Sequence, residues 1–406
     1  MQKRHVWPDG HWNWPIKVSH KQGVVSGDMI WVSGQVDLTP DGVVRHQGDI
    51  AVQTAHAMTN FASVLSHCDA SLADLVKLLC FYVDDASRTE RDVLEMIAMA
   101  LPDGPGPAVT MVPAPYLAYP GMDIEIEGYA MRPDLERHRI APGPKSPLPP
   151  SFSEAVRCGK MIFVSGQTPL DDAGNLVAPG DAVAQTHQSM QQIAAHLAAF
   201  SADFADVVKS NRWYAGHGTV EDFEPAALAC AEYYAKPGPA ATGVPLPRMG
   251  LEGQMIKLEA VAMLAEDGAR LPRRHVWPDS LWDWTIPLPY QHGLKCHDMI
   301  FLGGQVALDK QGHAVHPGEL SKQTRIAMDH IGTILSELGV DYQDVCKVTT
   351  VYEGGCSHDD LHENLSIRSG YFEDPGPATT GIPLPKLAYP AMVIEIEIFA
   401  MAEPDG

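Results

Sequence analysis

Hydrophobic and polar positions follow the same order three times along this chain. Each round begins with a short run of β-branched and aromatic residues that ends in Gly-Gln, which predicts a strand. A Gly followed by an acidic residue then precedes an amphipathic stretch, and a negative charge there suits the start of a helix. In the first round the apolar residues of this stretch are spaced by three and four, as on one helix face. The predicted first strands are residues 29–35, 161–167 and 299–305.

A second strand and a second helix complete each round. In the first round they are predicted at residues 76–83 and 89–100. A Gly-Pro-Ala step then starts a further extended segment, and the round closes on a strand in which Ile and Glu alternate with period two. The predicted order is β-β-α-β-α-β-β, an α+β plan with two helices on one side of a sheet.

The three rounds superimpose without a gap. Gln35 recurs as Gln167 and Gln305, which sets offsets of 132 (167 minus 35) and 270 (305 minus 35). The same offsets relate Lys77 to Lys209 and Lys347, and Glu127 to Glu259 and Glu397. A fixed period of this size indicates a tandem array of whole units. We therefore expect three domains, at residues 1–134, 148–265 and 272–406, joined by linkers without a hydrophobic pattern at 132–150 and 265–273.

Composition narrows the classes of partner. The chain of 406 residues is 45% hydrophobic and has a net charge of −22. Nucleic acid and anionic membranes are not expected as partners, because both require a basic surface. The seven cysteines include no CxxC pair, so no disulfide or zinc framework is predicted. Without an apolar N-terminal run or a stretch of eighteen apolar residues, we expect no signal peptide and no membrane span, and a cytoplasmic location.

The combination of motifs resembles the RidA/YjgF family, also called the L-PSP family. It comprises the Ser-Gly-Gln strand, a Gln-Thr pair on the first helix, the Val-Lys strand, Gly-Pro-Ala and the closing Ile-Glu-Ile-Glu strand, and it covers essentially the whole chain three times. The resemblance implies chorismate-mutase-like domains that form an intramolecular pseudo-trimer. It also implies small-molecule sites in the clefts between domains, no cofactor, and hydrolysis of enamines or imines with release of ammonia. Fusion breaks the symmetry, so the three clefts need not be alike; further homo-oligomerisation stays open.

The chain departs from the family at the residues expected to bind substrate. The family's carboxylate-binding Arg is replaced by Val109, Ala241 and Thr379. The following column is threonine in every copy, a possible ligand for substrate or water, with an ordinary strand threonine as the alternative. These residues are Thr110, Thr242 and Thr380. The column of the family's active-site Tyr holds His20, Phe152 and Tyr290, which suggests either specialisation or a variable strand entrance.

Three glutamates match the family's cleft carboxylate and are the predicted proton shuttles. They are Glu127, Glu259 and Glu397. The alternative is a solvated strand face, because Glu125 and Glu395 alternate with apolar residues in the same way. Arg212, present only in copy two, could supply the missing guanidinium from another strand; otherwise it is a surface residue. The strand-start lysines, Lys77 and its equivalents, are expected to extend along the surface toward water.

Tryptophans distinguish the copies. Copies one and three begin with a related Trp-rich segment, at residues 4–15 and 274–285, that copy two lacks. Its tryptophans are interpreted either as packing arms or as lids that offer flat surfaces to a conjugated ligand. The candidates are Trp12, Trp14, Trp282 and Trp284. Cys356 and His358 lie in one loop of copy three and could form a nucleophile pair or part of a metal site. No further ligands at known spacings accompany them, so the signal is weak and no metal site is predicted.

The sequence thus favours a cofactor-independent hydrolase of an enamine, imine or related C–N bond in a small conjugated molecule. A non-catalytic metabolite-binding protein of the same fold is the main alternative. Ribonuclease activity is a third possibility, and the strongly negative charge opposes it.

Overall fold

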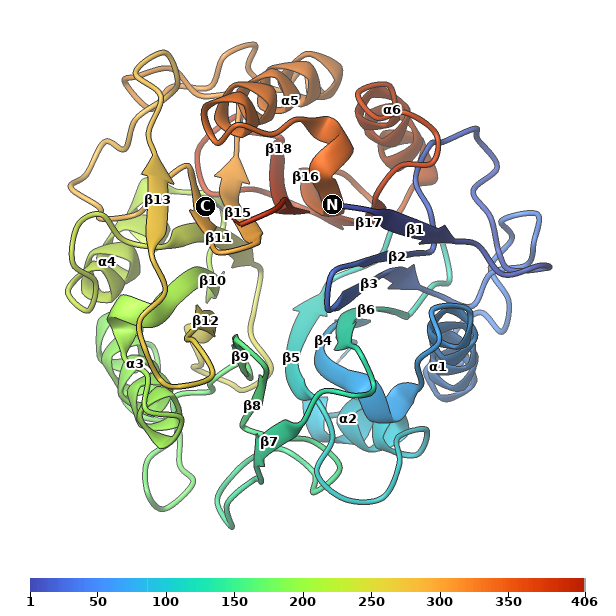
Figure 1. The fold of residues 1–406 in the computed structure, drawn as a ribbon, viewed down its shortest axis with the longest axis horizontal. Helices are drawn as coiled ribbons and strands as arrows, with labels where there is room; N and C mark the ends of the chain where they lie inside the picture. Colours follow the sequence, from blue (N-terminus) through green and yellow to red (C-terminus); the bar gives the residue numbers. More distant parts are fainter. Residues whose placement is uncertain (86, 405–406) are drawn as a thin grey trace.

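A computed structural model, which describes residues 1–85 and 87–404, shows three six-stranded sheets, each accompanied by two long helices (Figure 1). The strand order in the first sheet is β1-β2-β3-β6-β4-β5, and the other two sheets repeat it. Only the last two strands of each order run parallel; the other neighbours are antiparallel. The predicted α+β class is confirmed.

The element bounds repeat closely among the domains. The first domain contains β1 (Lys3–Val6), β2 (Gly23–Ser26), β3 (Met29–Gln35), α1 (Ile50–His67), β4 (Leu75–Val83), α2 (Glu90–Ala98), β5 (Ala108–Ala114) and β6 (Ile124–Met131). The second contains β7 (Arg137–Ile140), β8 (Ala155–Cys158), β9 (Met161–Val164), α3 (Ala182–Ala199), β10 (Val207–Ala215), α4 (Val220–Ala231), β11 (Ala240–Leu246) and β12 (Ile256–Met263). The third contains β13 (Arg273–Val276), β14 (Gly293–Cys296), β15 (Met299–Gln305), α5 (Leu320–Glu337), β16 (Val345–Glu353), α6 (His358–Ser369), β17 (Ala378–Leu384) and β18 (Ile394–Met401).

The first helices begin where the Gly-acid pairs predict. Asp49 and Asp181 are the N-caps of α1 and α3, and each carboxylate accepts a hydrogen bond from a backbone N–H of the first turn. Glu319 occupies the same place before α5 without a side-chain cap. The glycine before each cap has a positive φ, between 74° and 85°, which glycine adopts at little cost. These local signals explain why the helix starts were readable from sequence.

One strand in each sheet was not predicted. The edge strands β1, β7 and β13 pair with β2, β8 and β14. The expectation of an unpatterned linker at 132–150 was therefore wrong, since β7 lies inside it, and β13 begins at the last residue of the expected second linker. Each strand has only four residues, too few for a reliable period-two pattern. Copy two builds this strand from the linker because it lacks the Trp-rich segment.

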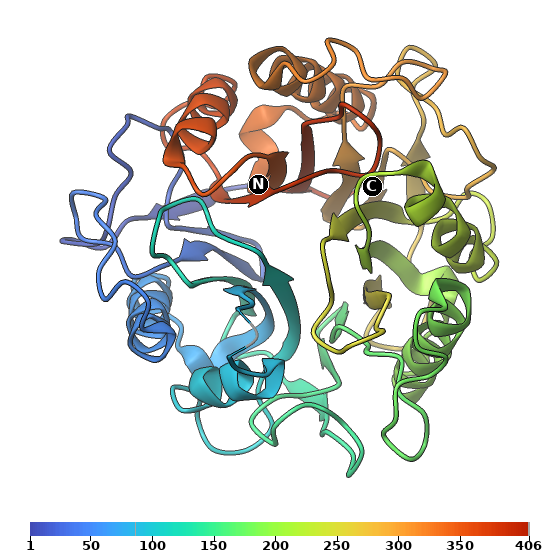
Figure 2. The same ribbon diagram turned by 180° about the vertical axis from the view of Figure 1, so that it is seen from behind.

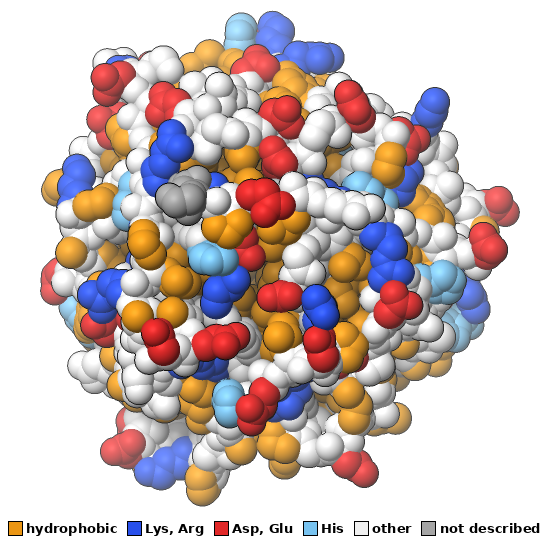
Figure 3. All heavy atoms as spheres, in the orientation of Figure 1, with side chains coloured by type: hydrophobic (Ala, Val, Ile, Leu, Met, Phe, Trp, Pro, Cys, Tyr) orange, Lys and Arg blue, Asp and Glu red, His pale blue; other side chains and the backbone are white. Residues whose placement is uncertain are grey.

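The sheets face the middle of the molecule and the helices lie around its rim (Figures 1 and 2). Aromatic side chains from all three sheets meet in a central core that includes Trp31, Tyr129, Phe163, Phe301 and Phe399. Among the described helices, none combines the length and the apolar character needed to cross a bilayer. On the face drawn in Figure 3, acidic and basic side chains are interspersed.

Backbone contacts close the three domains into a ring. Isolated parallel bridges join Ala108 to Ser153, Ala240 to Gln291 and Ala378 to Lys21. Each bridge joins the edge strand β5, β11 or β17 of one domain to the next domain. The third bridge leads from domain 3 back to domain 1. The structure therefore has three equivalent junctions between domains, which we call the 1–3 cleft, the 3–2 cleft and the 2–1 cleft after the domains that form them.

Candidate active site

The three predicted catalytic glutamates form buried ion pairs between neighbouring domains. Each carboxylate lies 2.5–2.8 Å from a lysine of the adjoining domain, and the paired side chains are at most 8% exposed. The pairs are Glu127 with Lys347, Glu259 with Lys77, and Glu397 with Lys209. The expectation that these lysines extend to water was wrong. Their strands begin at a domain interface, where a carboxylate from the neighbouring domain takes the place of solvent.

The invariant threonines complete these interfaces. Thr110 accepts a hydrogen bond from Lys77 at 2.7 Å and donates one to Glu259 at 2.5 Å. Thr242 connects Lys209 and Glu397 in the same way, at 2.5 and 2.8 Å. Lys347 also donates to Thr380, at 2.7 Å. The Thr, Lys and Glu columns therefore form a repeated buried network that joins the domains.

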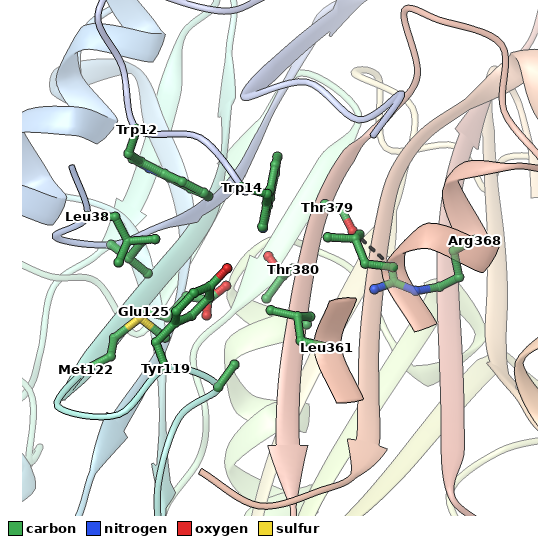
Figure 4. A pocket seen from close by; sticks show the side chains of 14 residues that line it. Trp12, Trp14, Leu38, Tyr119, Met122, Glu125, Leu361, Arg368, Thr379 and Thr380 are labelled. Atoms are coloured by element: carbon green, nitrogen blue, oxygen red, sulfur yellow. Dashed lines mark hydrogen bonds between the residues drawn. The ribbon is translucent and has the colours of Figure 1, made fainter. Parts of the chain in front are cut away.

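A different glutamate column lines the clefts. Glu125 lies on the wall of a cavity between domains 1 and 3, and its carboxyl points toward Tyr119 and Thr380 in Figure 4. Domain 1 contributes the predicted Trp12 and Trp14 to the same cavity, and domain 3 contributes Arg368. The remaining walls are apolar or small side chains, namely Val36, Leu38, Ala118, Met122, Leu361, Leu365, Thr379 and Gly381.

Burial shifts the protonation of the Glu125 carboxyl toward neutral pH. Burial raises the pKa of Glu125 to about 8, and the negative charge of Glu127 adds to the shift, while Lys347 opposes it. Burial likewise raises the pKa of Glu395, the equivalent residue of domain 3, to about 8 against the opposing effect of Lys209. A carboxyl with a pKa in this range can both donate and accept a proton near pH 7.

The glycine of the Ser-Gly-Gln motif makes room for these carboxyls. A Cβ atom added to Gly34 would lie 1.9 Å from Oε1 of Glu125, and one added to Gly304 would lie 1.8 Å from Oε1 of Glu395. Real side chains do not approach so closely, so a larger residue would displace the carboxyl. The glycine of the first strand thus leaves the space that the glutamate of the closing strand occupies.

Two arginines from different elements bring a guanidinium to equivalent places. Arg368 extends from α6, whereas the predicted Arg212 extends from β10. Their Nη2 atoms would lie 3.6 Å and 2.9 Å from a Cβ placed on Gly381 and Gly243, which share one repeat column. In domain 1 that column is Met111, and the domain has no equivalent arginine. Two clefts therefore contain a guanidinium, although this chain lacks Arg at the position where the family has it.

Arg368 is held in place and retains donors for a ligand. Its Nε and Nη2 donate to Oδ1 of Asn364, at 3.0 and 2.9 Å, and Nη1 donates to Thr379 at 3.1 Å. Three of its five N–H donors are therefore used within the described residues. Burial lowers the pKa of Arg368 to about 9, which leaves the guanidinium cationic at neutral pH. Such a group is suited to bidentate binding of a carboxylate.

The 3–2 cleft has the same charges but is filled. Arg212 is buried, not a surface residue, and its guanidinium carbon lies 4.5 Å from the centre of the Phe223 ring. Phe223 in turn stacks on Trp284, with ring centroids 6.1 Å apart and an angle of 16°. The residue equivalent to Phe223 in the 1–3 cleft is the smaller Leu361. The 3–2 cleft therefore has a stack of two aromatic rings beside its arginine, where the 1–3 cleft has Leu361.

In the 2–1 cleft, the charged side chains pair with each other. Lys257 replaces the cleft glutamate, and its ammonium lies 2.6 Å from the Glu90 carboxylate of domain 1. It also donates to the carbonyl of Met111 at 2.8 Å. Tyr82 donates to the same Glu90 carboxylate, at 3.3 Å. Among the described residues, the cation and the carboxylate of this cleft are therefore paired with each other.

Two tyrosine hydroxyls in the Glu-Arg clefts have no partner among the described residues. They belong to Tyr352 and Tyr214, the equivalents of the hydrogen-bonded Tyr82. The pKa of Tyr352 is raised well above its ordinary value, first by burial and then by the charge of Glu125. Buried polar groups are usually hydrogen-bonded, so the Tyr352 hydroxyl has hydrogen-bonding capacity that the described residues leave unused, although Tyr352 itself does not line the cavity.

The other predicted residues lie outside the cavity. His20, Phe152 and Tyr290 are buried at domain interfaces. Nδ1 of His20 donates a hydrogen bond to the Pro377 carbonyl at 3.3 Å, and burial lowers the pKa of His20 well below the ordinary value. Tyr290 packs against Tyr234, with ring centroids 5.9 Å apart. Burial places the pKa of Tyr290 well above its ordinary value, and the neighbouring Cys230 adds to the shift.

The remaining tryptophans and the loop pair also have defined places. Trp282 packs edge-to-face on Trp284, with ring centroids 4.7 Å apart, on the domain 3 side of the filled cleft. Cys356 is exposed, and His358 stacks on His362, which lies 2.8 Å from the Tyr119 hydroxyl at the cavity. Neither Cys356 nor His358 lines the cavity.

The cavity of the 1–3 cleft is small as it stands. Its volume is about 20 Å³, enough for about one water molecule. A larger ligand must therefore displace part of the wall. Trp12 and Trp14 belong to a segment without regular secondary structure, whereas the opposite wall is formed by α6 and β17. The tryptophan segment is thus one part of the wall that no helix or strand holds in place.

Comparisons with known proteins agree with this architecture. The sequence pattern of the endoribonuclease L-PSP family matches residues 16–132, 145–264 and 286–402. Protein DfrA of Myxococcus xanthus is 35% identical over 123 residues, 30% of this chain and 88% of that protein. A mouse (Mus musculus) 2-iminobutanoate/2-iminopropanoate deaminase is 29% identical over 114 residues, 26% of this chain and 84% of the deaminase. A chorismatase structure shares the fold over 81% of this chain and 93% of its own, with a TM-score of 0.54 and 13% identity.

Proposed function

Because this chain belongs to the endoribonuclease L-PSP family, we propose that it hydrolyses the C–N bond of a small imine or enamine that carries a carboxylate, at the 1–3 cleft and without a cofactor. One observation carries the proposal. A buried carboxyl with a pKa of about 8, Glu125, and a buried guanidinium, Arg368, line the same cavity. Similarity to iminobutanoate deaminases supports the reaction type.

The reaction needs a proton at one step and a base at the next. For an enamine, the protonated Glu125 carboxyl donates its proton to the β-carbon, and the product is an iminium ion. Glu125, now a carboxylate, removes a proton from a water molecule as the water oxygen bonds to the iminium carbon. The resulting carbinolamine loses ammonia, and the carbonyl product forms. One water is consumed and one ammonia released, and Glu125 ends protonated as it began.

The surrounding side chains orient the substrate. Arg368 would bind the substrate carboxylate with its two unused N–H donors. Tyr352, whose hydroxyl has no partner in the described structure, would hydrogen-bond the substrate nitrogen or the attacking water. Trp12 and Trp14 would cover a flat conjugated system and exclude bulk water. Because Arg368 can bind a carboxylate, the expected substrates include imines derived from amino acids, even though this chain lacks Arg at the family's position.

The test is ammonia release from imines formed in place. 2-Iminopropanoate would be compared with an imine of similar size that lacks a carboxylate, using the intact chain and its Arg368→Met variant. We expect acceleration of the carboxylated substrate only, and a loss of roughly 10- to 100-fold in kcat/KM for Arg368→Met, as for one charge-assisted hydrogen-bonded contact. The matched control is Arg212→Met in the filled cleft, which should keep full activity. Absence of any acceleration, or equal loss in both variants, would contradict the proposal.

A further inference from the structure

Three metal-ligating side chains converge on domain 1, away from the ion pairs and arginines described above. Asp37 follows β3, His46 lies in the loop before α1, and His56 lies on α1. One ligand atom from each lies within 4.8 Å of the others. We propose that Asp37, His46 and His56 form a binding site for a divalent transition-metal ion, with Zn²⁺ as the reference ion.

The distances suit a single ion. Nδ1 of His46 lies 2.7 Å from Oδ2 of Asp37, and Nδ1 of His56 lies 2.9 Å from Oδ1. The two imidazole rings are 4.7 Å apart between centroids, at an angle of 64°. Zinc binds nitrogen at about 2.0–2.1 Å and carboxylate oxygen at about 2.0–2.2 Å. An ion at the centre of this group therefore requires only small outward shifts of three side chains.

Burial of Asp37 fixes the carboxylate, and exposure of the two histidines lets an ion enter. The Asp37 side chain is 1% exposed, whereas those of His46 and His56 are 39% and 35% exposed. Arg45 lies 3.6 Å from the Asp37 carboxylate but is 45% exposed, so it can move into solvent when a cation binds. Two imidazoles and one carboxylate would leave a position for water, and this ligand set favours Zn²⁺, Co²⁺ or Ni²⁺ over Mg²⁺ or Ca²⁺.

The repeats show that the fold does not require this trio. The equivalent residues are Pro169, Ala178 and Gln188 in copy two, and Ala307, His316 and Ile326 in copy three. The backbone is nevertheless alike, because His46, Ala178 and His316 all have φ between 39° and 50°. Copy one thus keeps a common backbone and adds three ligands to it. A network retained for architecture alone would be expected in all three copies.

The site lies next to the wall of the 1–3 cavity. Val36 and Leu38, the neighbours of Asp37 in sequence, both line that cavity. A bound ion would join the end of β3 to α1 and the loop between them. It would therefore hold the cavity wall in place, and its binding should raise the stability of the intact protein.

The test uses the metal alone and the full chain. The exposed thiol of Cys356 would be replaced in every sample (Cys356→Ser), because it could bind zinc elsewhere. Zn²⁺ affinity would be measured by competition with a chromophoric chelator, and Co²⁺ binding by its visible absorption. The test variants are Asp37→Asn and the double change His46→Ala with His56→Gln, which installs the residues of copy two. His362→Ala, at the pair of stacked histidines of α6, is the control.

We expect one Zn²⁺ per chain, an affinity loss of more than about 100-fold in both test variants, and no loss in the control. The thermal midpoint should rise with Zn²⁺ in the intact chain and in His362→Ala only. Equal affinities for the intact chain and the two test variants would overturn the proposal, as would a loss of binding in His362→Ala. Because the readouts are affinity and stability, they are independent of imine hydrolysis.

Discussion

The Lys347 ammonium of domain 3 lies 2.8 Å from the Glu127 carboxylate of domain 1, and neither side chain is exposed. Removing one partner of such a pair leaves a buried charge without compensation. We predict that Lys347→Met destabilises the protein by about 3–5 kcal/mol, and that adding Glu127→Gln recovers part of the loss. Thermal or chemical denaturation would measure both. The control is Lys386→Met, which breaks an exposed pair with Glu353. A similar loss in the control would contradict the account.

The raised pKa of the cleft glutamates predicts how stability depends on pH. The folded protein keeps the Glu125 proton up to about pH 8, whereas the unfolded chain loses it near the ordinary value of 4.5. A raised folded-state pKa stabilises fully below pH 4.5 and loses this contribution as the pH rises to 8. Glu125→Gln should therefore be more favourable to stability at pH 9 than at pH 5. A difference from the original protein that does not change with pH would contradict the raised pKa.

Gly34 and Gly304 offer a matched pair for testing the role of the strand glycines. Alanine at either position would place a Cβ within 2 Å of a cleft carboxylate, so we expect each change to cost about 1–3 kcal/mol in stability. Only Gly34→Ala should also abolish ammonia release, because it displaces Glu125. Loss of activity in Gly304→Ala, with Gly34→Ala fully active, would assign catalysis to the other cleft.

Phe223 closes the 3–2 cleft, so a smaller residue should open it. Phe223→Leu installs the residue that the 1–3 cleft has at this position, and removes the stack on Trp284. In a protein already inactivated by Glu125→Gln, we expect this change to restore measurable ammonia release that depends on Glu395 and Arg212. The cost in stability should be about 1–3 kcal/mol. No recovery, despite a folded protein, would show that charge and space are insufficient for activity at this cleft.

The sequence contained most of the fold. Constant offsets indicated three repeats, and Gly-acid pairs marked the helix starts, because both signals are local. The four-residue edge strands escaped notice since they carry no periodicity. The burial of the strand-start lysines could not be predicted, because the carboxylate that pairs with each one, such as Glu259 with Lys77, comes from another domain. Burial of this kind depends on how domains meet, which no local pattern records.

The site was less predictable than the fold. Arg212, on a strand, is a predicted replacement for the family Arg, whereas Arg368 is not, because it lies on a helix. No local pattern shows that a side chain from this helix reaches the place of one from the strand. Glu125 alternates with apolar residues along its strand, and this pattern is also typical of a solvated strand face. One signal was present in the sequence, namely the glycine in each Ser-Gly-Gln motif. The structure explains why glycine is needed there, because Gly34 faces the Glu125 carboxyl.

The most direct test of the central claim compares Glu125→Gln with Glu395→Gln for kcat/KM of ammonia release from 2-iminopropanoate. The two residues share a repeat column, burial and a pKa of about 8, and differ in whether their cleft is open. We predict a loss of roughly 10²–10⁴-fold for Glu125→Gln, as expected when a general acid is removed, and little change for Glu395→Gln. Full activity in Glu125→Gln, or equal losses in both variants, would contradict the assignment of the active site to the 1–3 cleft.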